Sequence, residues 1–472
     1  VGFCGLECYR STVVVIVSLC NVELPPSWQI LEKSNQALPS TINSNFFGPN
    51  IDLPLVEKPK HADWYAAARN ILFREAYNTS HVTRPDVAEK TFIIKVSENR
   101  RLTPETYNRY LFHIEFDTTG TDLKYDLGEA LGVYGHNDPK EVNQFLKYYN
   151  LNPNGLISIP NKEGDRYETR TILQIFSQAL DIFGRPAKRF YESLALYATN
   201  ENERNRLLWI ASKEGAEEFK RRLADTITYA DLLFEFTSAK PPVEDLVQMI
   251  APIKPRHYSI ASAQSIHPNS VHLLVVTVDW VNSSGKKRFG QCTRYLSNLK
   301  VGERITVSIK PSVMKLPPRD TQPVIMAGLG TGMAPFRAFI EERAYRKSQG
   351  IEVGPMILYF GSRNKAMEYL YGEELEAYHS EGLLTHLQLA FSRDQPHKVY
   401  IQHKMNEDAK LLHEYLLKEE GWFYLCGPTW PVPDVKDAIV NSFMTAGGLS
   451  ENEAIDYVNK LKDLERYILE VY

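Results

Sequence analysis

The chain has 472 residues, of which 43% are apolar and 24% charged, and its formal net charge is -4. Because domains average about 150 residues, this length predicts two or three domains rather than one core. The ordinary composition excludes a fibrous or largely disordered chain. The slightly acidic balance and the absence of long Lys/Arg runs predict that no nucleic acid is bound.

Cysteine use and the most apolar segment bear on the compartment. Five cysteines, three of them Cys4, Cys8 and Cys20, are too few for a disulfide scaffold and indicate a reducing, cytoplasmic environment. No second Cys pair or His follows Cys4 and Cys8 closely, so we predict no metal site there. Residues 13–17 form an apolar run far shorter than the ~20 residues of a membrane span. A buried strand is the prediction and a signal peptide the alternative, and because the chain begins at Val1 without Met we expect a fragment.

Changes of pattern divide the chain into three parts. Residues 1–85 are rich in Pro, Asn and Ser with little periodicity, which indicates an extension or linker. Residues 86–318 contain short alternating and β-branched runs typical of a β domain, interrupted at about 137–255 by helical periodicity. In residues 319–472, short apolar runs alternate with helical stretches, as in an α/β domain with a parallel sheet.

The expected elements follow from these patterns. The β domain is predicted to contain strands at residues 90–96, 110–116, 257–262, 271–280 and 304–309. The helical part is predicted to contain helices at residues 141–149, 191–198, 207–223 and 243–250. The α/β domain is predicted to contain strands at residues 324–327, 356–360, 384–391 and 422–426, with a helix at 336–348.

A glycine-rich turn, Gly328-Leu329-Gly330-Thr331-Gly332, lies between a predicted strand and a predicted helix. Glycines allow backbone N–H groups to approach a pyrophosphate, and the helix N-terminus adds a partial positive charge. No Gly-Lys-Ser/Thr follows, so the turn is not a P-loop. We interpret it as a dinucleotide site that includes Gly330 and Thr331, with an ordinary structural loop as the alternative.

Polar residues follow the next strands of the α/β domain. Carboxyl ends of parallel strands meet at one crevice, so these side chains are expected to converge, and their cations suit a 2′-phosphate, which favours NADP over NAD. Solvated loops are the alternative. The residues are Ser362, Arg363, Ser392, Arg393, Lys398, Tyr400 and Gln402. Cys426 ends a fourth strand, either as a polarizable thiol against nicotinamide or as a small buried residue.

The β domain carries the segment Arg256-His257-Tyr258-Ser259. Tyr258 offers a ring to stack on isoalloxazine, Ser259 a hydroxyl for flavin N5, and Arg256 a charge for a pyrophosphate. Strict alternation places Arg256 and Ser259 on opposite faces, so a bend or strand end is needed for both to reach one ligand. Gly290-Gln291-Cys292-Thr293 precedes a helical stretch and indicates a second anion-binding helix start, for the FAD diphosphate.

These motifs occur in the order found in the ferredoxin–NADP reductase superfamily, which the chain resembles over about residues 85–472. The helical segment and the Tyr-terminated tail are similar to its diflavin reductase branch. Residues 123–133, 181–188 and 465–472 look most like the family of NADPH sulfite reductase flavoproteins, and residues 426–433 are similar to its fungal members.

The resemblance implies an antiparallel β-barrel FAD domain with an all-helical insertion, followed by an α/β parallel-sheet NADP-binding domain. It assigns to FAD the residues Arg256, His257, Tyr258, Ser259, Val276, Gly290, Gln291, Cys292, Thr293 and Tyr472. It assigns to NADPH the residues Arg100, Gly330, Thr331, Ser362, Arg363, Ser392, Arg393, Lys398, Tyr400 and Gln402. Ser259, Cys426 and Glu470 are expected to assist hydride transfer, while Tyr472 covers the flavin until nicotinamide displaces it.

Two departures qualify this expectation. The family's tail carboxylate is usually Asp, and Glu470 is one methylene longer. No flavodoxin-like segment precedes residue 85, so FMN is expected only on a separate chain or in a missing domain.

The function implied is oxidation of NADPH by FAD, with electrons passing to a sulfite reductase haemoprotein or an FMN-bearing protein in a hetero-oligomer. That partner would reduce sulfite to hydrogen sulfide in sulfate assimilation and cysteine biosynthesis. A cytochrome P450 reductase-like donor to another acceptor and a non-catalytic structural subunit are the alternatives.

Overall fold

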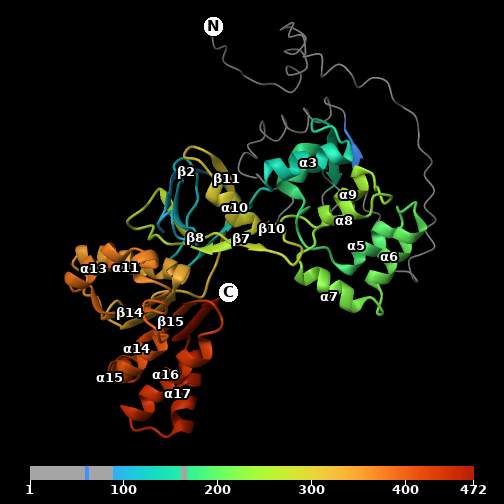
Figure 1. The fold of residues 1–472 in the computed structure, drawn as a ribbon. Helices are drawn as coiled ribbons and strands as arrows, with labels where there is room; N and C mark the ends of the chain where they lie inside the picture. The colour runs from blue at the N-terminus through green and yellow to red at the C-terminus, as the bar shows by residue number, and fades with distance from the viewer. Residues whose placement is uncertain (1–58, 63–88, 161–166) are drawn as a thin grey trace, which may run out of the picture.

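The computed structural model describes residues 59–62, 89–160 and 167–472 (Figure 1). The Cys4–Cys8 pair, the apolar run 13–17 and most of the expected linker lie outside this part of the chain. Among the helices of the described part, none combines the length and apolar character that crossing a bilayer requires.

The first large unit is a six-stranded antiparallel sheet with the strand order β7-β4-β11-β2-β3-β8. Its strands are β2 (Thr91–Arg101), β3 (Leu111–Asp117), β4 (Ala130–Val133), β7 (Arg256–Ser259), β8 (Ser270–Val276) and β11 (Arg304–Lys310). The expected antiparallel sheet is therefore confirmed. The two edge strands meet only near the isolated bridge between Ile260 and Leu273, so continuous pairing around a closed barrel is not observed.

Helices predominate between β4 and β7 and surround a core of their own (Figure 1). They are α3 (Pro139–Tyr149), α4 (Ile172–Gln174), η3 (Ile175–Ala179), α5 (Lys188–Ala195), α6 (Glu201–Ala211), α7 (Ala216–Ala224), α8 (Tyr229–Glu235) and α9 (Val243–Met249). The prediction that this part is all-helical is wrong, because β5 (Leu156–Pro160) and β6 (Tyr167–Thr171) form a small sheet with β1 (Lys60–His61).

The helix expected over residues 207–223 is two helices, α6 and α7. They are separated at Gly215, where a Cβ atom would lie 2.0 Å from the carbonyl oxygen of Trp209. The apolar periodicity of the sequence continued across this turn, so the break was not visible as a change of pattern.

A hairpin and a helix connect β8 to β11. They are β9 (Asp279–Val281), β10 (Lys287–Phe289) and α10 (Gln291–Asn298). The predicted strand 271–280 thus comprises β8 and β9, which belong to different sheets.

The second large unit is a five-stranded parallel sheet with the order β14-β13-β12-β15-β16, which confirms the expected α/β architecture. Its strands are β12 (Val324–Leu329), β13 (Met356–Ser362), β14 (Leu384–Phe391), β15 (Trp422–Gly427) and β16 (Tyr467–Val471). One side packs against α11 (Ala334–Ser348) and α13 (Gly372–Ser380), with η4 (Gly330–Met333) and α12 (Lys365–Glu368) nearby in sequence. The other side packs against α14 (Ile401–Glu407), α15 (Ala409–His413), η5 (Glu414–Lys418), α16 (Val432–Thr445) and α17 (Glu451–Asp463).

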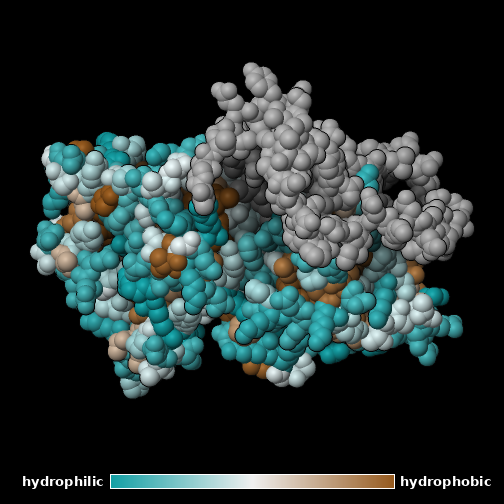
Figure 2. All heavy atoms as spheres, turned by 90° about the horizontal axis from the view of Figure 1, so that it is seen from above, coloured by the Kyte–Doolittle hydropathy of each residue, from teal (hydrophilic) through white to brown (hydrophobic). Residues whose placement is uncertain are grey.

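One apolar cluster joins the two sheets. Leu111 of β3 and Leu274 of β8 are buried together with Phe336 and Phe339 of α11. Alternate residues of the same strands, such as Phe112, belong to the separate core inside the antiparallel sheet. Because successive strand residues face opposite sides, the antiparallel sheet uses one face for its own core and the other to bind the parallel-sheet unit. The outer surface seen in Figure 2 is mainly hydrophilic, with small apolar patches.

We expect Leu111→Ala to lower the free energy of unfolding by about 2–5 kcal/mol, because it removes a fully buried side chain from this shared cluster. Chemical denaturation followed by circular dichroism measures the change. Leu464→Ala, at a side chain that is 50% exposed, is the control and should change stability little. Equal effects of the two substitutions would contradict the role of the shared cluster.

Candidate active site

Three chemically active side chains meet where the two sheets join. Ser259 is the last residue of β7, while Cys426 of β15 and Glu470 of β16 lie opposite each other in parallel register. The Ser259 hydroxyl lies close enough to the Cys426 thiol and to the Glu470 carboxyl group to lower the pKa of each, against the larger effect of burial. A hydroxyl from one unit thus meets a thiol and a carboxyl group from the other.

The surroundings of these groups control their protonation. Burial raises the pKa of the Cys426 thiol, and the nearby Glu470 charge raises it further, so the sulfur carries its proton at neutral pH. Burial also raises the pKa of Glu470, opposed by a hydrogen bond from Ser312 and by the charge of Lys310. The Ser312 hydroxyl donates to Glu470 Oε2 at 3.3 Å.

The start of α10 is shaped by side-chain contacts. Gln291 Nε2 donates to the carbonyl oxygen of Gly135 at 2.8 Å, and Thr293 Oγ1 accepts from the backbone N–H of Val278 at 3.3 Å. Gly290 is the N-cap residue, and no side chain caps the helix. The side chains therefore hold the turn in place, while the first N–H groups of the helix remain available to an anion.

The β7 segment lies next to this turn. Tyr258 contacts Cys292, and burial raises the pKa of both groups, that of Cys292 to about 11. The Arg256 charge opposes both shifts, so the guanidinium is close to them. His257 points to the other face, where it lies near Gly132. The strand ends at Ser259, which meets the sequence-based requirement for a strand end.

Val276 differs from the other residues expected to bind flavin. It ends β8 and packs into the apolar cluster that joins the two sheets. Val278, two residues later, instead holds the α10 turn through its backbone: its carbonyl oxygen accepts from the N–H of Gly290 at 2.7 Å. Because Val278 makes this contact through its main chain, the residue type at position 278 gave no indication of it in the sequence.

The glycine-rich turn packs directly on β15. A Cβ atom at Gly332 would lie 2.0 Å from the carbonyl oxygen of Cys426, whereas Gly330, at φ +58°, faces open space. Glycine at 332 thus allows the turn to touch the Cys426 backbone, and glycine at 330 allows the left-handed conformation. Tyr472 Oη lies 2.7 Å from Thr331 Oγ1, so the terminal ring reaches this turn.

The ends of β13 and β14 are joined to each other. The backbone N–H groups of Ser392 and Arg393 donate to the carbonyl oxygens of Ser362 and Arg363, at 3.0 and 2.8 Å. The Ser362 hydroxyl donates to Glu368. This arrangement brings the two Ser-Arg pairs to one edge, as the sequence predicts.

The residues after β14 are distributed differently. Lys398 is exposed, and the ring of Tyr400 lies edge-on to Trp430, with centroids 5.3 Å apart. Gln402 Nε2 donates to Asp434 of α16 at 3.0 Å, which ties α14 to α16. Gln402 Oε1 is buried without a hydrogen-bond partner.

A cation that the sequence did not single out lies near the terminal tyrosine. Arg109 Nη1 pairs with the buried Glu368 at 2.6 Å, and its guanidinium lies near enough to the Tyr472 hydroxyl to interact with it electrostatically. Arg100, the expected cation, pairs with Glu98 at 2.7 Å on an exposed part of β2. The only sequence signal for Arg109 is a charge in the β2–β3 connection, which is typical of any surface loop.

Within the described residues, one group of side chains has metal-ligating types in proximity: His113, Glu115 and His272, with ligand atoms within 4.8 Å of one another. The His113 nitrogens already lie 2.8 Å from Tyr371 Oη and 2.9 Å from Glu115 Oε1. The Arg337 guanidinium is 3.5 Å from His272 Nδ1. An adjacent fixed cation disfavours a metal ion, so we treat the group as part of the contact between the two units.

Two family models match the chain in succession. The FAD binding domain matches residues 84–295, and the oxidoreductase NAD-binding domain matches residues 326–436.

The chain therefore contains one region similar to an FAD binding domain and a second region similar to an oxidoreductase NAD-binding domain.

Its similarity to named proteins is high. It is 48% identical over 450 residues to the sulfite reductase [NADPH] flavoprotein component of Saccharomyces cerevisiae, which covers 93% of the chain and 43% of the relative. It is 47% identical over 448 residues to a probable sulfite reductase [NADPH] flavoprotein component of Schizosaccharomyces pombe, covering 93% of the chain and 44% of the relative. It is 34% identical over 404 residues to NADPH--cytochrome P450 reductase of Cavia porcellus, covering 82% and 59%. The chain spans less than half the length of the two fungal relatives.

The chain thus carries regions that match an FAD-binding and an oxidoreductase NAD-binding domain. The uncapped start of α10 and the open side of Gly330 are two anion-accepting turns, one in each matched region. Ser259 follows Tyr258, which contacts Cys292 of the first turn, and the Cys426 backbone contacts Gly332 of the second turn.

The raised pKa of Glu470 predicts a pH-dependent stability difference. The folded chain holds this proton more tightly than the unfolded chain, in which the pKa of Glu470 has its ordinary value of 4.5, so stability falls as the pH rises through the folded pKa. We expect the free energy of unfolding of the wild type, relative to Glu470→Gln, to decrease as the pH rises from 4.5 through the raised pKa of the folded state.

Thermal or urea denaturation across this pH range measures the difference. The exposed Glu465→Gln variant controls for the loss of one negative charge from the same tail. A difference that stays constant or grows with pH would show that Glu470 is not buried as an acid.

Proposed function

We propose that this protein is a reductase that accepts a hydride from NADPH on FAD and passes the electrons to a partner FMN or haem protein, which we assign to sulfite reductase. The single observation that supports this best is the contact of Ser259, from the flavin-side sheet, with Cys426 and Glu470 of the nucleotide-side sheet. Such a contact is needed where nicotinamide and flavin meet.

The proposed roles follow the geometry. Ser259 would hydrogen-bond at flavin N5, the neutral Cys426 thiol would contact nicotinamide, and the carboxyl group of Glu470 would stabilise charge as hydride leaves. FAD supplies the ability to take two electrons together and release them singly. Catalysis by the chain itself then consists of orientation and electrostatics.

The proposed binding roles involve two further sets of groups. Tyr258, Arg256 and the 290–293 turn would hold FAD. The 328–332 turn and the two Ser-Arg pairs would hold NADPH, with Arg109 as a candidate for the role expected of Arg100, since it lies near Tyr472. Tyr472 would move from Thr331 when the nucleotide binds.

The proposed organisation has an extension at 1–85, an FAD domain at 86–318 interrupted at about 137–255, and an NADP domain at 319–472. The FAD unit is proposed to form a β-barrel in which the Ile260–Leu273 bridge marks closure. We propose FMN on a separate chain or domain, a haemoprotein partner in a cytoplasmic hetero-oligomer, and sulfite as the final electron acceptor. Similarity to the two fungal flavoprotein components supports this assignment.

A second candidate is a donor to a cytochrome P450-type acceptor, favoured by the identity of 34% to the guinea-pig reductase. Adding purified sulfite reductase haemoprotein, together with an FMN-bearing domain, and measuring NADPH oxidation separates the two. Sulfide production supports the first candidate, and oxidation only with a P450 acceptor supports the second.

The visible spectrum tests the core of the proposal. A purified protein with FAD absorbs near 450 nm, and NADPH should bleach this band under anaerobic conditions. A colourless protein that takes up no added FAD would overturn the proposal in favour of a structural subunit.

We expect Cys426→Ala to slow flavin reduction by NADPH about tenfold or more while FAD content changes little, because the thiol contacts the reacting ring rather than the flavin's binding turn. Stopped-flow absorbance at 450 nm gives the rate, and the flavin-to-protein ratio gives the binding. Parallel losses of rate and FAD would contradict the assigned role.

A further inference from the structure

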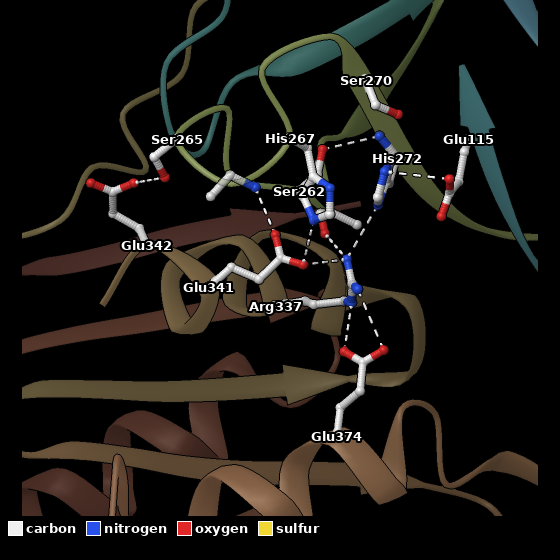
Figure 3. Close-up of polar contacts among 12 residues, drawn as sticks. Glu115, Ser262, Ser265, His267, Ser270, His272, Arg337, Glu341, Glu342 and Glu374 are labelled. Atoms are coloured by element: carbon white, nitrogen blue, oxygen red, sulfur yellow. Dashed lines mark hydrogen bonds and ion pairs between the residues drawn. The ribbon is translucent and has the colours of Figure 1, made fainter. Parts of the chain in front are cut away.

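Two residues of α11, Arg337 and Glu341, form hydrogen bonds with the backbone that follows β7 (Figure 3). Arg337 Nη1 donates to the carbonyl oxygen of Ala261 at 2.8 Å. Glu341 Oε2 accepts from the N–H of Ala263 at 2.8 Å. Arg337 and Glu341 pair with each other at 2.9 Å, so the helix holds both ends of a three-residue segment.

The Arg337–Glu341 pair is buried, and a second helix, α13, contributes further contacts to it. The side chains of Arg337 and Glu341 are 12% and 5% exposed. Arg337 Nε also pairs with Glu374 of α13 at 2.9 Å, and its guanidinium lies over the ring of Tyr371, 4.9 Å from the centroid. Removing one member of such a network leaves buried polar groups unpaired, which costs more than the contact alone.

His272, which lies beside Arg337, acts as a neutral partner. Burial lowers the pKa of His272 to about 2, so its ring is uncharged and its Nδ1 can face Arg337 at 3.5 Å. His267 Nε2 lies 3.1 Å from Glu341 Oε1. Two carboxylates, Glu341 and Glu374, face Arg337. Burial lowers the pKa of Arg337, but the charges of these two carboxylates outweigh it and raise the pKa.

The Arg337–Glu341 pair lies close in the chain to both halves of the proposed active site. Ser259 lies two residues before Ala261, and α11 begins directly after the glycine-rich turn. The same two side chains therefore connect the strand end that carries the flavin-side hydroxyl to the helix that follows the nucleotide turn. Apolar packing of Phe336 and Leu111 brings the units together, but it does not define a direction as hydrogen bonds do.

We propose that Arg337 and Glu341 are positioning residues that align Ser259 with Cys426 for hydride transfer. This inference rests on the proposed function. Neither residue touches the reacting atoms; they act through the backbone of residues 261–263.

Arg337→Lys is the test. Lys keeps the charge and can pair with Glu341, but a single ammonium cannot serve Ala261, Glu341 and Glu374 with the fixed fork of a guanidinium. We expect the limiting rate of flavin reduction by NADPH to fall about 10- to 100-fold, since small misplacements of reacting groups have effects of this size. The deuterium isotope effect with NADPH labelled at the transferred position should rise, while FAD content and affinity for 2′,5′-ADP stay within about twofold.

A readout independent of turnover is hydrogen exchange of the peptide that contains Ala263. Exchange should be faster in Arg337→Lys and in Glu341→Gln than in the wild type, with or without NADPH. Glu341→Gln is the second variant if Arg337→Lys yields no folded protein, because it keeps the side-chain size and weakens the acceptor.

Arg343→Lys is the matched control. Arg343 is a fully buried arginine of the same helix whose partner, Asp320, belongs to the nucleotide-side unit, so its loss should reduce stability without affecting alignment. The proposal is wrong if Arg343→Lys slows hydride transfer as much as Arg337→Lys. It is also wrong if Arg337→Lys loses FAD or 2′,5′-ADP binding in parallel with rate, or leaves both rate and exchange unchanged. If wild-type flavin is not reduced by NADPH at all, the proposed function fails instead, whatever the exchange data show.

Discussion

Packing of α11 against the outer face of the antiparallel sheet is the contact on which the rest of the structure depends. Ser259 belongs to one sheet, and Cys426 and Glu470 belong to the other, so their meeting exists only while this contact holds. The shared cluster around Leu111 and Phe336 supplies the burial. The relative positions of these three side chains therefore depend on how accurately the two units are held together.

The junction combines two kinds of interaction with different consequences. Apolar burial is roughly proportional to area and tolerates small rotations. Buried charge pairs such as Arg337–Glu341 contribute little net stability after desolvation, but they penalise arrangements in which they are unpaired. Their placement beside the β7 end is therefore easier to understand as a requirement for one orientation than as a source of stability.

Those parts of the fold and of the candidate site that depend on short stretches of sequence could be predicted. The turn 328–332 and the strand ends at Ser362 and Ser392 follow from short apolar runs and glycine spacing, and the parallel sheet was confirmed. Glu470 was recognised only through resemblance, because its place opposite Cys426 depends on β16 pairing with β15 across more than forty residues. The cation Arg109 was missed for a related reason, because its partner Glu368 is distant in the sequence. Strands β5 and β6 were missed although they pair with each other locally, because the surrounding helical periodicity dominated the pattern.

The terminal tyrosine makes a weak contact with the turn that is proposed to bind the nucleotide. Tyr472 is 65% exposed, yet its hydroxyl lies 2.7 Å from Thr331 in the turn proposed for the nucleotide. A second contact, from its N–H to the carbonyl oxygen of Gly427, is made by the backbone at 3.0 Å and leaves the ring free to turn. One exposed hydrogen bond contributes about 0.5–1.5 kcal/mol, far less than a dinucleotide gains from two or more charged contacts. The ring can therefore shield the turn when no nucleotide is bound and still give way when one arrives.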